Sequence, residues 1–383
     1  MTDHKVVGTG AAQAAPRVGV IGGGQLARMM QEAAIALGIE LHALVEAGDG
    51  AAGQAVVHSS VGAAHDRAAV AELAGKVDVL TVEHEHVPPD ILRDFGARPG
   101  PQALAYAQDK LLMRQKMDEL SVPCPRWMRV RDARQLEAAA AQLPGGIVVK
   151  TPRGGYDGKG VAFGLEDAAA WLEEFPEGIL VEERVPFTRE IAQLVARRPS
   201  GEMASWCAVE TIQDGGICFE TIAPAPIGEE LAGQARAIGE TIAQGLGVVG
   251  VLAVEMFVTD RGLLVNELAM RPHNSGHWTI EGAATSQFEQ HLRAVLDLPL
   301  GDTAARASHA VMVNILGSRL EDPRQAYPRV MEAYPEAKIH MYGKAVTPRR
   351  KLGHVTVVGE DLARVREAAE GAAALLRGER MDT

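Results

Sequence analysis

The segment from Arg17 to Glu46 constrains the fold of this chain more than any other. It begins with "RVGVI", a short apolar run of strand length, and continues with "GGGQLARMMQEAAIALG", in which a glycine turn precedes apolar residues at helical spacing. "ELHALVE" is a second strand pattern, so the segment predicts a βαβ unit. Further strand and helix patterns alternate after it, including "VDVLTVEHEHV", which Pro88-Pro89 closes. We therefore expect an open parallel sheet.

The chain is long enough for more than one core, and 383 residues favour two or three domains. After the prolines of "SVPCPRW", short strands separated by glycines ("GGIVVK", "GVAFG", "GILVEERV") indicate a small α+β lobe. Longer strand patterns such as "EIAQLVARR" and "VLAVEMFV" then indicate a mixed or antiparallel sheet. The expected divisions are a disordered tail over 1–16, a parallel α/β (Rossmann-like) domain over 17–125, a central α+β domain over 126–300 with a small lobe over about 126–190, and a β-rich domain over 301–383.

Composition narrows the choice of partners. The formal net charge of −12 disfavours nucleic acid or an anionic membrane, because both need a basic surface. Three cysteines, far apart and without a CxxC pair, favour a reduced, cytoplasmic setting. No run approaches the roughly 18 apolar residues of a membrane span. Small anionic substrates held in local cationic pockets are the expected partners.

The glycine turn has two interpretations. Gly22-x-Gly24-x-x-Ala27 after a strand, with Glu46 ending the next strand, matches the dinucleotide fingerprint and would suit an NAD(P)-dependent oxidoreductase. The free N–H groups of a helix beginning near Gln25 would equally suit a phosphate on another substrate. We keep the oxidoreductase as a remote alternative.

The segment "VLTVEHEHVPP" places carboxylates near the same crevice. Strand alternation would put Glu83 and Glu85 on one face, with His84 and His86 on the other, which disfavours a transition-metal site. Side chains at the carboxyl end of a parallel strand border the ligand crevice. These glutamates are therefore either close to a substrate or solvated charges at the strand end.

The segment "VLAVEMFVTDRGLLVNELAMR" predicts a hairpin. A three-residue loop, Asp260-Arg261-Gly262, has Gly where a left-handed residue is needed, and the resulting register places Glu255 opposite Glu267. Like charges opposed on a sheet are destabilising, so the pair is expected to hold a cation. Carboxylate oxygens, with Asn266 nearby, suit Mg²⁺. A register shifted by one residue would instead give two solvated glutamates.

The loop "KTPRGGYDGKGV", from Lys150 to Val161, is rich in glycine and cations but is not a Walker A loop. Gly160 follows Lys159 where Ser or Thr is required, and Arg153 replaces the first Gly of that motif. A phosphate-holding loop, a lysine ending an apolar strand and a carboxylate pair for magnesium together indicate a nucleotide enzyme without a Walker A motif.

This combination resembles the ATP-grasp enzymes, and in particular their N5-carboxyaminoimidazole ribonucleotide synthetase family. The resemblance extends from about Arg17 to the end of the chain, through "GGGQLARM", "GGYDGKG", "NELAMRPHNSGHW", "SQFEQHLRAV" and "RKLGHV". It implies an α/β fold of ATP-grasp architecture, with a Rossmann-like domain, a two-lobed central ATP-grasp domain and a small C-terminal domain. It also implies a cytoplasmic homodimer that uses ATP and Mg²⁺.

The resemblance implies roles for individual residues. ATP would contact Lys110, Lys150, Gly155, Tyr156, Asp157, Gly158, Lys159, Gly160, Val161, Glu182, Glu183, Arg184, Val185, Glu190, Gln213, Asn266 and Glu267. Magnesium would be held by Glu255 and Glu267. Bicarbonate and the ribonucleotide would be surrounded by the catalytic residues Tyr156, Asp157, Arg271, His273 and Asn274. Further contacts to the ribonucleotide are expected from Gly24, Gln25, Leu26, Glu83, Lys344, Arg350 and Lys351.

The implied reaction is the carboxylation of aminoimidazole ribonucleotide in purine biosynthesis. ATP and bicarbonate would form carboxyphosphate, and the loop from Gly155 to Val161 would close over the β- and γ-phosphates and exclude water. Another ATP-grasp ligase, such as the formate-dependent glycinamide ribonucleotide transformylase, is the main alternative. A nucleotide-binding module without catalysis is a third possibility. The basic cluster "KAVTPRRKLGH" is either a solvated face or the site of the ribonucleotide phosphate.

Overall fold

The computed structural model describes residues 14–155, 159–165 and 168–379. Its N-terminal part is a four-stranded parallel sheet in the order β3-β2-β1-β4, as the βαβ pattern predicts. The strands are β1 (Arg17–Ile21), β2 (Glu40–Val45), β3 (His58–Val61) and β4 (Val79–Val82). The helices are α1 (Gln25–Leu37), α2 (Arg67–Ala74), α3 (Pro89–Asp94), α4 (Pro101–Gln108) and α5 (Lys110–Glu119).

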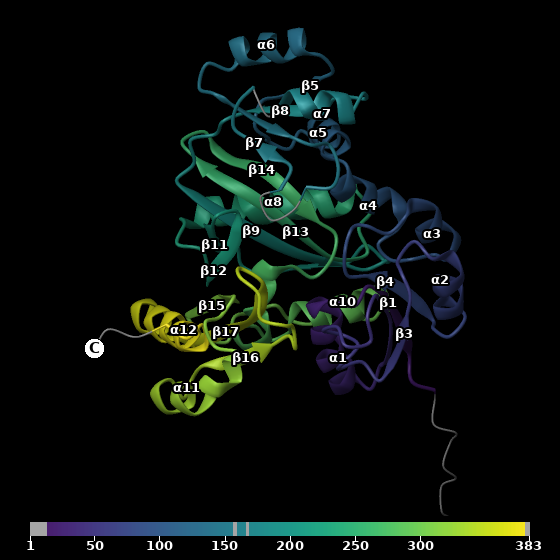
Figure 1. The fold of residues 1–383 in the computed structure, drawn as a ribbon, viewed down its shortest axis with the longest axis vertical. Coiled ribbons are helices and arrows are strands. Elements are labelled where there is room, and N and C mark those ends of the chain that lie inside the picture. The colour runs from purple at the N-terminus through teal and green to yellow at the C-terminus, as the bar shows by residue number, and fades with distance from the viewer. Residues whose placement is uncertain (1–13, 156–158, 166–167, 380–383) are drawn as a thin grey trace, which may run out of the picture.

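A small lobe follows, and it stands apart at the top of Figure 1. Its sheet has the order β5-β8-β6-β7, and every pairing in it is antiparallel. The strands are β5 (Trp127–Val130), β6 (Ile147–Lys150), β7 (Val161–Ala162) and β8 (Ile179–Glu183), with helices α6 (Ala133–Gln142) and α7 (Ala168–Glu174). Leu136 of α6 and Val149 and Val181 of the sheet belong to one buried apolar cluster, so the lobe has its own core.

The centre of the molecule is a nine-stranded antiparallel sheet in the order β14-β13-β9-β11-β12-β15-β17-β16, with β10 paired to β9. The strands are β9 (Arg189–Arg197), β10 (Met203–Ser205), β11 (Val209–Asp214), β12 (Ile217–Ala223), β13 (Gly250–Thr259), β14 (Gly262–Ala269), β15 (His309–Leu316), β16 (Lys338–Met341) and β17 (Lys351–Gly359). The helical segments are α8 (Glu229–Gly245), η1 (Asn274–Gly276), α9 (Thr279–Gly282), α10 (Gln287–Val295), η2 (Pro323–Ala326), α11 (Tyr327–Ala333) and α12 (Leu362–Leu376).

The C-terminal strands extend this central sheet, because β15 pairs with β12 on one side and β17 on the other. The boundary expected at residues 300 and 301 therefore falls within one continuous sheet, and the domain limits stay predictions. Helix α12 packs on this end of the sheet, with Ala369 and Ala372 in a buried cluster with Val355. Small side chains on the helix allow that close approach.

Helix α10 joins the N-terminal sheet to the rest of the molecule. Phe288 and Leu292 of α10 belong to the same buried cluster as Leu26 and Met30 of α1, so a helix of the central part covers one face of the parallel sheet. Figure 1 shows α10 and α1 side by side. Within the described residues, no helix has the length and apolar character needed to cross a membrane.

Candidate active site

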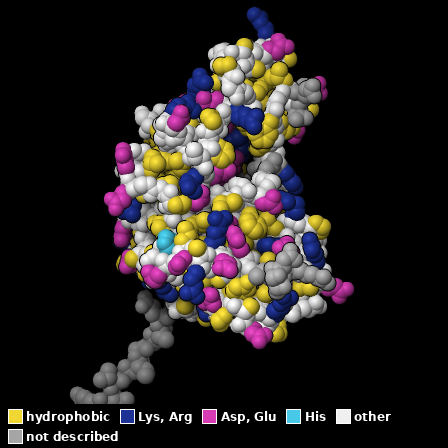
Figure 2. Space-filling view, turned by 90° about the vertical axis from the view of Figure 1, so that its left-hand side faces the viewer, with side chains coloured by type: hydrophobic (Ala, Val, Ile, Leu, Met, Phe, Trp, Pro, Cys, Tyr) yellow, Lys and Arg dark blue, Asp and Glu magenta, His cyan; other side chains and the backbone are white. Residues whose placement is uncertain are grey.

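A cleft of about 1520 Å³ lies between the small lobe and the central sheet. The space-filling view shows the lobe standing above the body, with the outline narrowing between them, and acidic and basic side chains interspersed over that face (Figure 2). The predicted residues that line the cleft are Lys110, Lys150, Gly155, Val161, Glu182, Glu183, Arg184, Val185, Glu190, Gln213, Glu255, Asn266, Glu267, Arg271, His273, Asn274 and Lys351. Tyr156, Asp157 and Gly158 lie outside the described residues.

The pairing of Glu255 with Glu267 is confirmed, although the predicted loop is wrong. Thr259 pairs with Gly262, so the connection has two residues, and Gly262 has a φ of +98°. The register then shifts between Glu255 and Met256, where Asn266 is bulged out of the ladder. The bulge lets Asn266 and Glu267 face the same cleft, although neighbours on a regular strand point to opposite faces.

The two carboxyl groups of this pair have different acidities. Burial, together with the negative charge of Glu267, raises the pKa of Glu255 to about 8. Burial also favours the neutral form of Glu267, but Lys110 and Lys150 outweigh it and lower the pKa of that group. Lys110 Nζ lies 3.4 Å from Glu267 Oε1. The pair therefore carries less than two negative charges as long as no cation lies between them.

Lys150 is held by two acceptors. Its Nζ lies 2.9 Å from Asn266 Oδ1 and 2.9 Å from Glu182 Oε2. Glu182 is predicted to contact ATP, but its buried carboxylate is engaged by Lys150 and by Arg114 Nε. Burial alone would raise the pKa of Glu182, whereas Arg114 and Lys150 lower it to about 2. Any contact of this residue with ATP is therefore left to its backbone.

Arg114 is a site residue that the sequence analysis missed. It is fully buried on α5, and its second guanidinium nitrogen donates to the Asn266 carbonyl oxygen at 2.8 Å. It thus ties the bulge of β14 to the base of the small lobe. The available signal was its position four residues after Lys110, because residues at this spacing share one face of a helix. Lys110 is also buried on that face.

The other residues predicted for the nucleotide occupy the wall of the cleft. Glu183 is bound by Arg126 and by Arg261, whose guanidinium nitrogen lies 2.7 Å from Glu183 Oε1. Burial raises the pKa of Glu190, while a hydrogen bond from Gln213 on the neighbouring strand β11 opposes this. Lys159 and Gly160 are described but are not among the lining residues.

Arg271, His273 and Asn274 meet at the inner end of the cleft. Arg271 Nε lies 2.9 Å from Glu85 Oε1, and His273 Nε2 lies 3.3 Å from Glu255 Oε1. Burial, with Arg271 and Lys351 nearby, lowers the pKa of His273 to about 3, so its imidazole is neutral. Asn274 is 8% exposed, and its buried amide makes no hydrogen bond to a nitrogen or oxygen atom among the described residues, although the Cys218 thiol lies beside it. A polar group buried in this way indicates a ligand position.

The glycine turn is already occupied by a carboxyl group of the chain itself, and burial raises the pKa of that group. Glu83 accepts hydrogen bonds from the backbone N–H groups of Gly24 and Ala27, the latter at 2.9 Å. A Cβ on Gly22 would come within 2.3 Å of Glu83 Cγ, which explains the glycine there. The position that a dinucleotide pyrophosphate would take is thus used by a side chain, which argues against the oxidoreductase.

The alternation expected for Glu83 to His86 does not apply, because β4 ends at Val82. Glu83 turns back to α1, whereas Glu85 reaches Arg271. Both glutamates therefore bind neighbouring groups of the chain, and neither is a solvated charge at a strand end. His84 Nε2 lies 3.6 Å from Glu46 Oε1, so the acidic residue of the dinucleotide fingerprint faces a histidine.

The three cations of the predicted basic cluster, Lys344, Arg350 and Lys351, have different surroundings in the structure. Lys344 Nζ donates to Gln25 Oε1 at the start of α1, next to Gly24 and Leu26. Lys351 lines the main cleft and favours the ionised form of Glu255. Arg350 is exposed, and its guanidinium lies 3.4 Å from the Ala345 carbonyl oxygen. The three cations therefore do not form one compact group, although Lys344 lies at the predicted phosphate position.

Comparison with known proteins matches the three parts of the chain to family models. Residues 16–108 match the ribonucleotide synthetase preATP-grasp domain, residues 115–288 the ATP-grasp domain, and residues 310–368 the phosphoribosylaminoimidazole carboxylase C-terminal domain. The N5-carboxyaminoimidazole ribonucleotide synthase of Mycobacterium tuberculosis is 49% identical over 374 residues, which cover 94% of this chain and 87% of that protein. This chain belongs to the N5-carboxyaminoimidazole ribonucleotide synthase family.

Members of this family with solved structures share the fold. The N5-carboxyaminoimidazole ribonucleotide synthetase of Thermus thermophilus is 37% identical, with a TM-score of 0.84 over 95% of this chain and 99% of that one. The Aspergillus clavatus enzyme, solved with ADP and 5-aminoimidazole ribonucleotide, is 30% identical, with a TM-score of 0.85 over 94% of this chain and 98% of that one. The predicted ATP-grasp architecture is thus confirmed, and the chain is an ATP-grasp carbon–nitrogen ligase.

Proposed function

We propose that this chain carboxylates 5-aminoimidazole ribonucleotide, with ATP and bicarbonate, to N5-carboxyaminoimidazole ribonucleotide, ADP and phosphate. The observation that carries the proposal is one cleft in which the facing carboxyl groups of Glu255 and Glu267 and the cations Lys110 and Lys150 adjoin the buried amide of Asn274. The family of the chain names the same reaction. The relative from Aspergillus clavatus was solved with ADP and the aminoimidazole ribonucleotide.

ATP is proposed to lie between the small lobe and the hairpin of β13 and β14. Lys110 and Lys150 would neutralise its phosphates, since phosphoryl transfer depends mainly on positioning and electrostatics. The side chains of Arg114 and Glu182 would position Lys150 and would not touch ATP themselves, because both are engaged in ion pairs. The loop from Gly155 to Val161 would cover the phosphates and keep water from carboxyphosphate.

The residues present fit Mg²⁺. Glu255 and Glu267 offer hard oxygen donors from facing positions. Burial and the charge of Glu267 raise the pKa of Glu255, and a divalent cation between the two groups would favour its ionised form. Bound there, Mg²⁺ would neutralise charge on the ATP phosphates. Magnesium as the resident ion, held by these two glutamates, is part of the proposal.

Bicarbonate is proposed to bind beside Arg271, His273 and Asn274. Arg271 would supply the positive charge, because the imidazole of His273 is neutral. A bicarbonate oxygen attacks the γ-phosphorus, ADP leaves, and carboxyphosphate forms. Its carboxyl carbon then bonds to the exocyclic amine of the ribonucleotide, phosphate leaves, and the amine loses one proton. Held at this point, the intermediate would adjoin Lys351 and the hairpin.

The choice of substrates is tested by ADP release from the purified chain with Mg²⁺ and ATP. We expect release with aminoimidazole ribonucleotide plus bicarbonate and only background with glycinamide ribonucleotide plus formate. Release with the second pair alone would replace the proposal with the transformylase. Release with neither pair, from a protein that binds ATP, would favour a module without catalysis.

The remaining family expectations are included in the proposal. The chain is proposed to act in the cytoplasm as a homodimer, and analytical ultracentrifugation should then give twice the mass of one chain. A single-chain mass across micromolar concentrations would contradict the dimer. The site roles of Gly24, Gln25, Leu26, Glu83, Lys344, Arg350 and Lys351 toward the ribonucleotide also stay proposals.

A further inference from the structure

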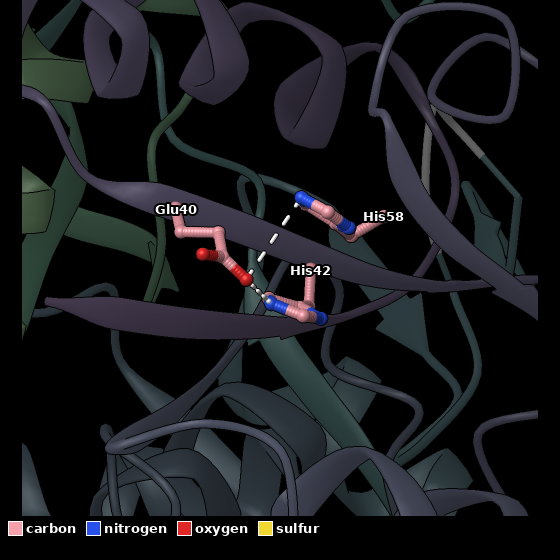
Figure 3. A group of neighbouring side chains, drawn as sticks. All are labelled: Glu40, His42 and His58. Carbon is pink, nitrogen blue, oxygen red and sulfur yellow. Dashed lines mark hydrogen bonds and ion pairs between the residues drawn. The ribbon is translucent and has the colours of Figure 1, made fainter. Parts of the chain in front are cut away.

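Two histidines and a glutamate gather on the parallel sheet, away from the cleft. Glu40 and His42 lie two residues apart on β2 and so point to the same face. His58 begins β3 and pairs directly with His42 in the strand register. The two imidazole rings stack, with centroids 4.7 Å apart and planes inclined by 18°. Figure 3 shows both rings presenting a nitrogen to the Glu40 carboxylate.

The donor atoms are close to the spacing of a tetrahedral ion. Glu40 Oε1 lies 2.6 Å from His42 Nε2 and 3.8 Å from His58 Nε2. Ligands of tetrahedral Zn²⁺, each at roughly 2.0–2.2 Å from the metal, are about 3.3 Å apart. The first contact must therefore open by about 0.7 Å and the second close by about 0.5 Å. Because a metal lies in the plane of each imidazole that binds it, binding would also turn the two stacked rings toward a common point. Among the described residues, this is the one group of three such side chains whose donor atoms all lie within 4.8 Å.

Solvent reaches this group from outside the sheet. The side chain of His58 is 49% exposed and that of Glu40 39% exposed, whereas His42 is largely covered at 12%. An ion there would have a fixed inner ligand, two outer ligands and an open side for a water molecule. Imidazole and carboxylate together suit zinc better than magnesium, which prefers oxygen ligands alone.

The position suggests what an ion would do. β3 is the edge strand, has only four residues and is mostly exposed. The group lies where β2 and β3 begin, whereas the glycine turn follows the end of β1, at the other end of these parallel strands. An ion at this place would join the edge strand to its neighbour and would take no part in the chemistry of the cleft.

We propose that Glu40, His42 and His58 form a structural Zn²⁺ site, with Nε2 of each histidine and one carboxylate oxygen as ligands and water as the fourth. The proposal is independent of the reaction assigned to the cleft. In the metal-free protein the same residues are held by the hydrogen bond between His42 and Glu40. Zinc would replace that contact and extend the link to β3.

The test is calorimetric titration of the full chain with ZnCl₂ at saturating MgCl₂, comparing the wild type with His58→Ala. Zinc can also enter the main cleft, so the result is the difference between the two proteins. We expect the variant to bind one zinc ion fewer, or that ion at least tenfold more weakly. His65→Ala is the matched control, because His65 is exposed in the loop just after β3 and is not part of the group. It should titrate like the wild type.

Two further readouts separate zinc binding from an effect on folding. Co²⁺ in place of Zn²⁺ should give the strong visible absorption of a tetrahedral site in the wild type and in His65→Ala, but not in His58→Ala or His42→Ala. Zinc should raise the Tm of the wild type by several degrees more than that of His58→Ala, because a ligand of the folded state stabilises it by mass action. Equal zinc counts and equal Co²⁺ spectra in the wild type and His58→Ala would overturn the proposal.

Discussion

Glu255 lies directly opposite Glu267 across β13 and β14, and the pKa values of the two carboxyl groups shift in opposite directions. The same hairpin bulges at Asn266, so three oxygen-bearing side chains face the cleft from adjacent positions. A hairpin of two apolar strands is an unfavourable place for paired carboxylates unless a cation or a proton separates them. The raised pKa of Glu255 favours its protonated form at neutral pH, and the proposed chemistry needs a cation.

Glu267→Gln should reduce ATP cleavage at least a hundredfold, because it removes the carboxylate that stays ionised opposite Glu255. The fold should persist, since glutamine has the same shape and Lys110 remains. ADP release at millimolar Mg²⁺ measures this, with circular dichroism to check folding. Asp260→Asn, in the exposed turn of the same hairpin, is the control and should keep its activity. Turnover of Glu267→Gln within tenfold of the wild type would remove the pair from the mechanism.

Arg114→Met should destabilise the protein by about 3–5 kcal/mol, the usual loss when one partner of a buried ion pair is removed. The reason is that the Glu182 carboxylate stays buried with Lys150 as its remaining cation. Unfolding in urea measures the change. Arg114→Met combined with Glu182→Met should recover part of the loss, because no unpaired carboxylate is left. If the double variant lost more unfolding free energy than the two single variants lose together, this account would be contradicted.

The ion pair of Arg114 and Glu182 also predicts how the stability of the protein depends on pH. The pKa of Glu182 falls from an ordinary 4.5 to about 2 in the folded protein. A lowered carboxyl pKa stabilises the fold fully above pH 4.5, and that stability is lost as the pH falls toward 2. The contribution is on the order of 3 kcal/mol. Urea unfolding between pH 6 and 3 should therefore show a shallower decline for Glu182→Gln than for the wild type. Parallel declines would show that Glu182 is not the group responsible.

Lys344→Ala should raise the KM for aminoimidazole ribonucleotide by about ten- to a hundredfold, equivalent to about 1.4–2.7 kcal/mol. Its ammonium group lies at the start of α1, where the ribonucleotide phosphate is proposed to bind. The KM for ATP should change less than twofold, because other lysines serve its phosphates. Lys338→Ala, exposed on β16, is the control. A rise in the KM for ATP alone would place Lys344 at the nucleotide.

Local patterns were enough to predict much of the fold. The alternation of apolar runs and glycine turns from Arg17 to Glu46 predicts β1, α1 and β2 correctly, because each element there buries its own apolar face. The segment "ASWCAVET" has a continuous strand pattern, but in the structure it divides into β10 and β11 around Trp206. Trp206 is 1% exposed, and its indole N–H donates to the Thr285 carbonyl oxygen. That partner is distant in sequence, so no local pattern could indicate the break.

Part of the candidate site could likewise be predicted from local sequence, and part could not. Glu255 and Glu267 could be paired from sequence because a hairpin is a local structure, and their separation along the chain sets the register. Arg114 and its contacts could not, since Glu182 and Asn266 are 68 and 152 residues away in sequence. The carboxyl group at the glycine turn was also unpredictable, because Glu83 reaches α1 only after its strand ends.

The sequence by itself determined the types of element, their order, the carboxylate pair and the family of the chain. Those features depend on periodicity, turn chemistry and short motifs, which act between residues close in the sequence. Only the tertiary structure decided which charges are used to hold the site together, as with Glu83, Arg114 and Glu182, and which remain to face a ligand, as with Glu267 and Asn274. The physical reason is that burial changes the free energy of a charge or an unpaired polar group by several kcal/mol, and burial is set by distant segments that pack together.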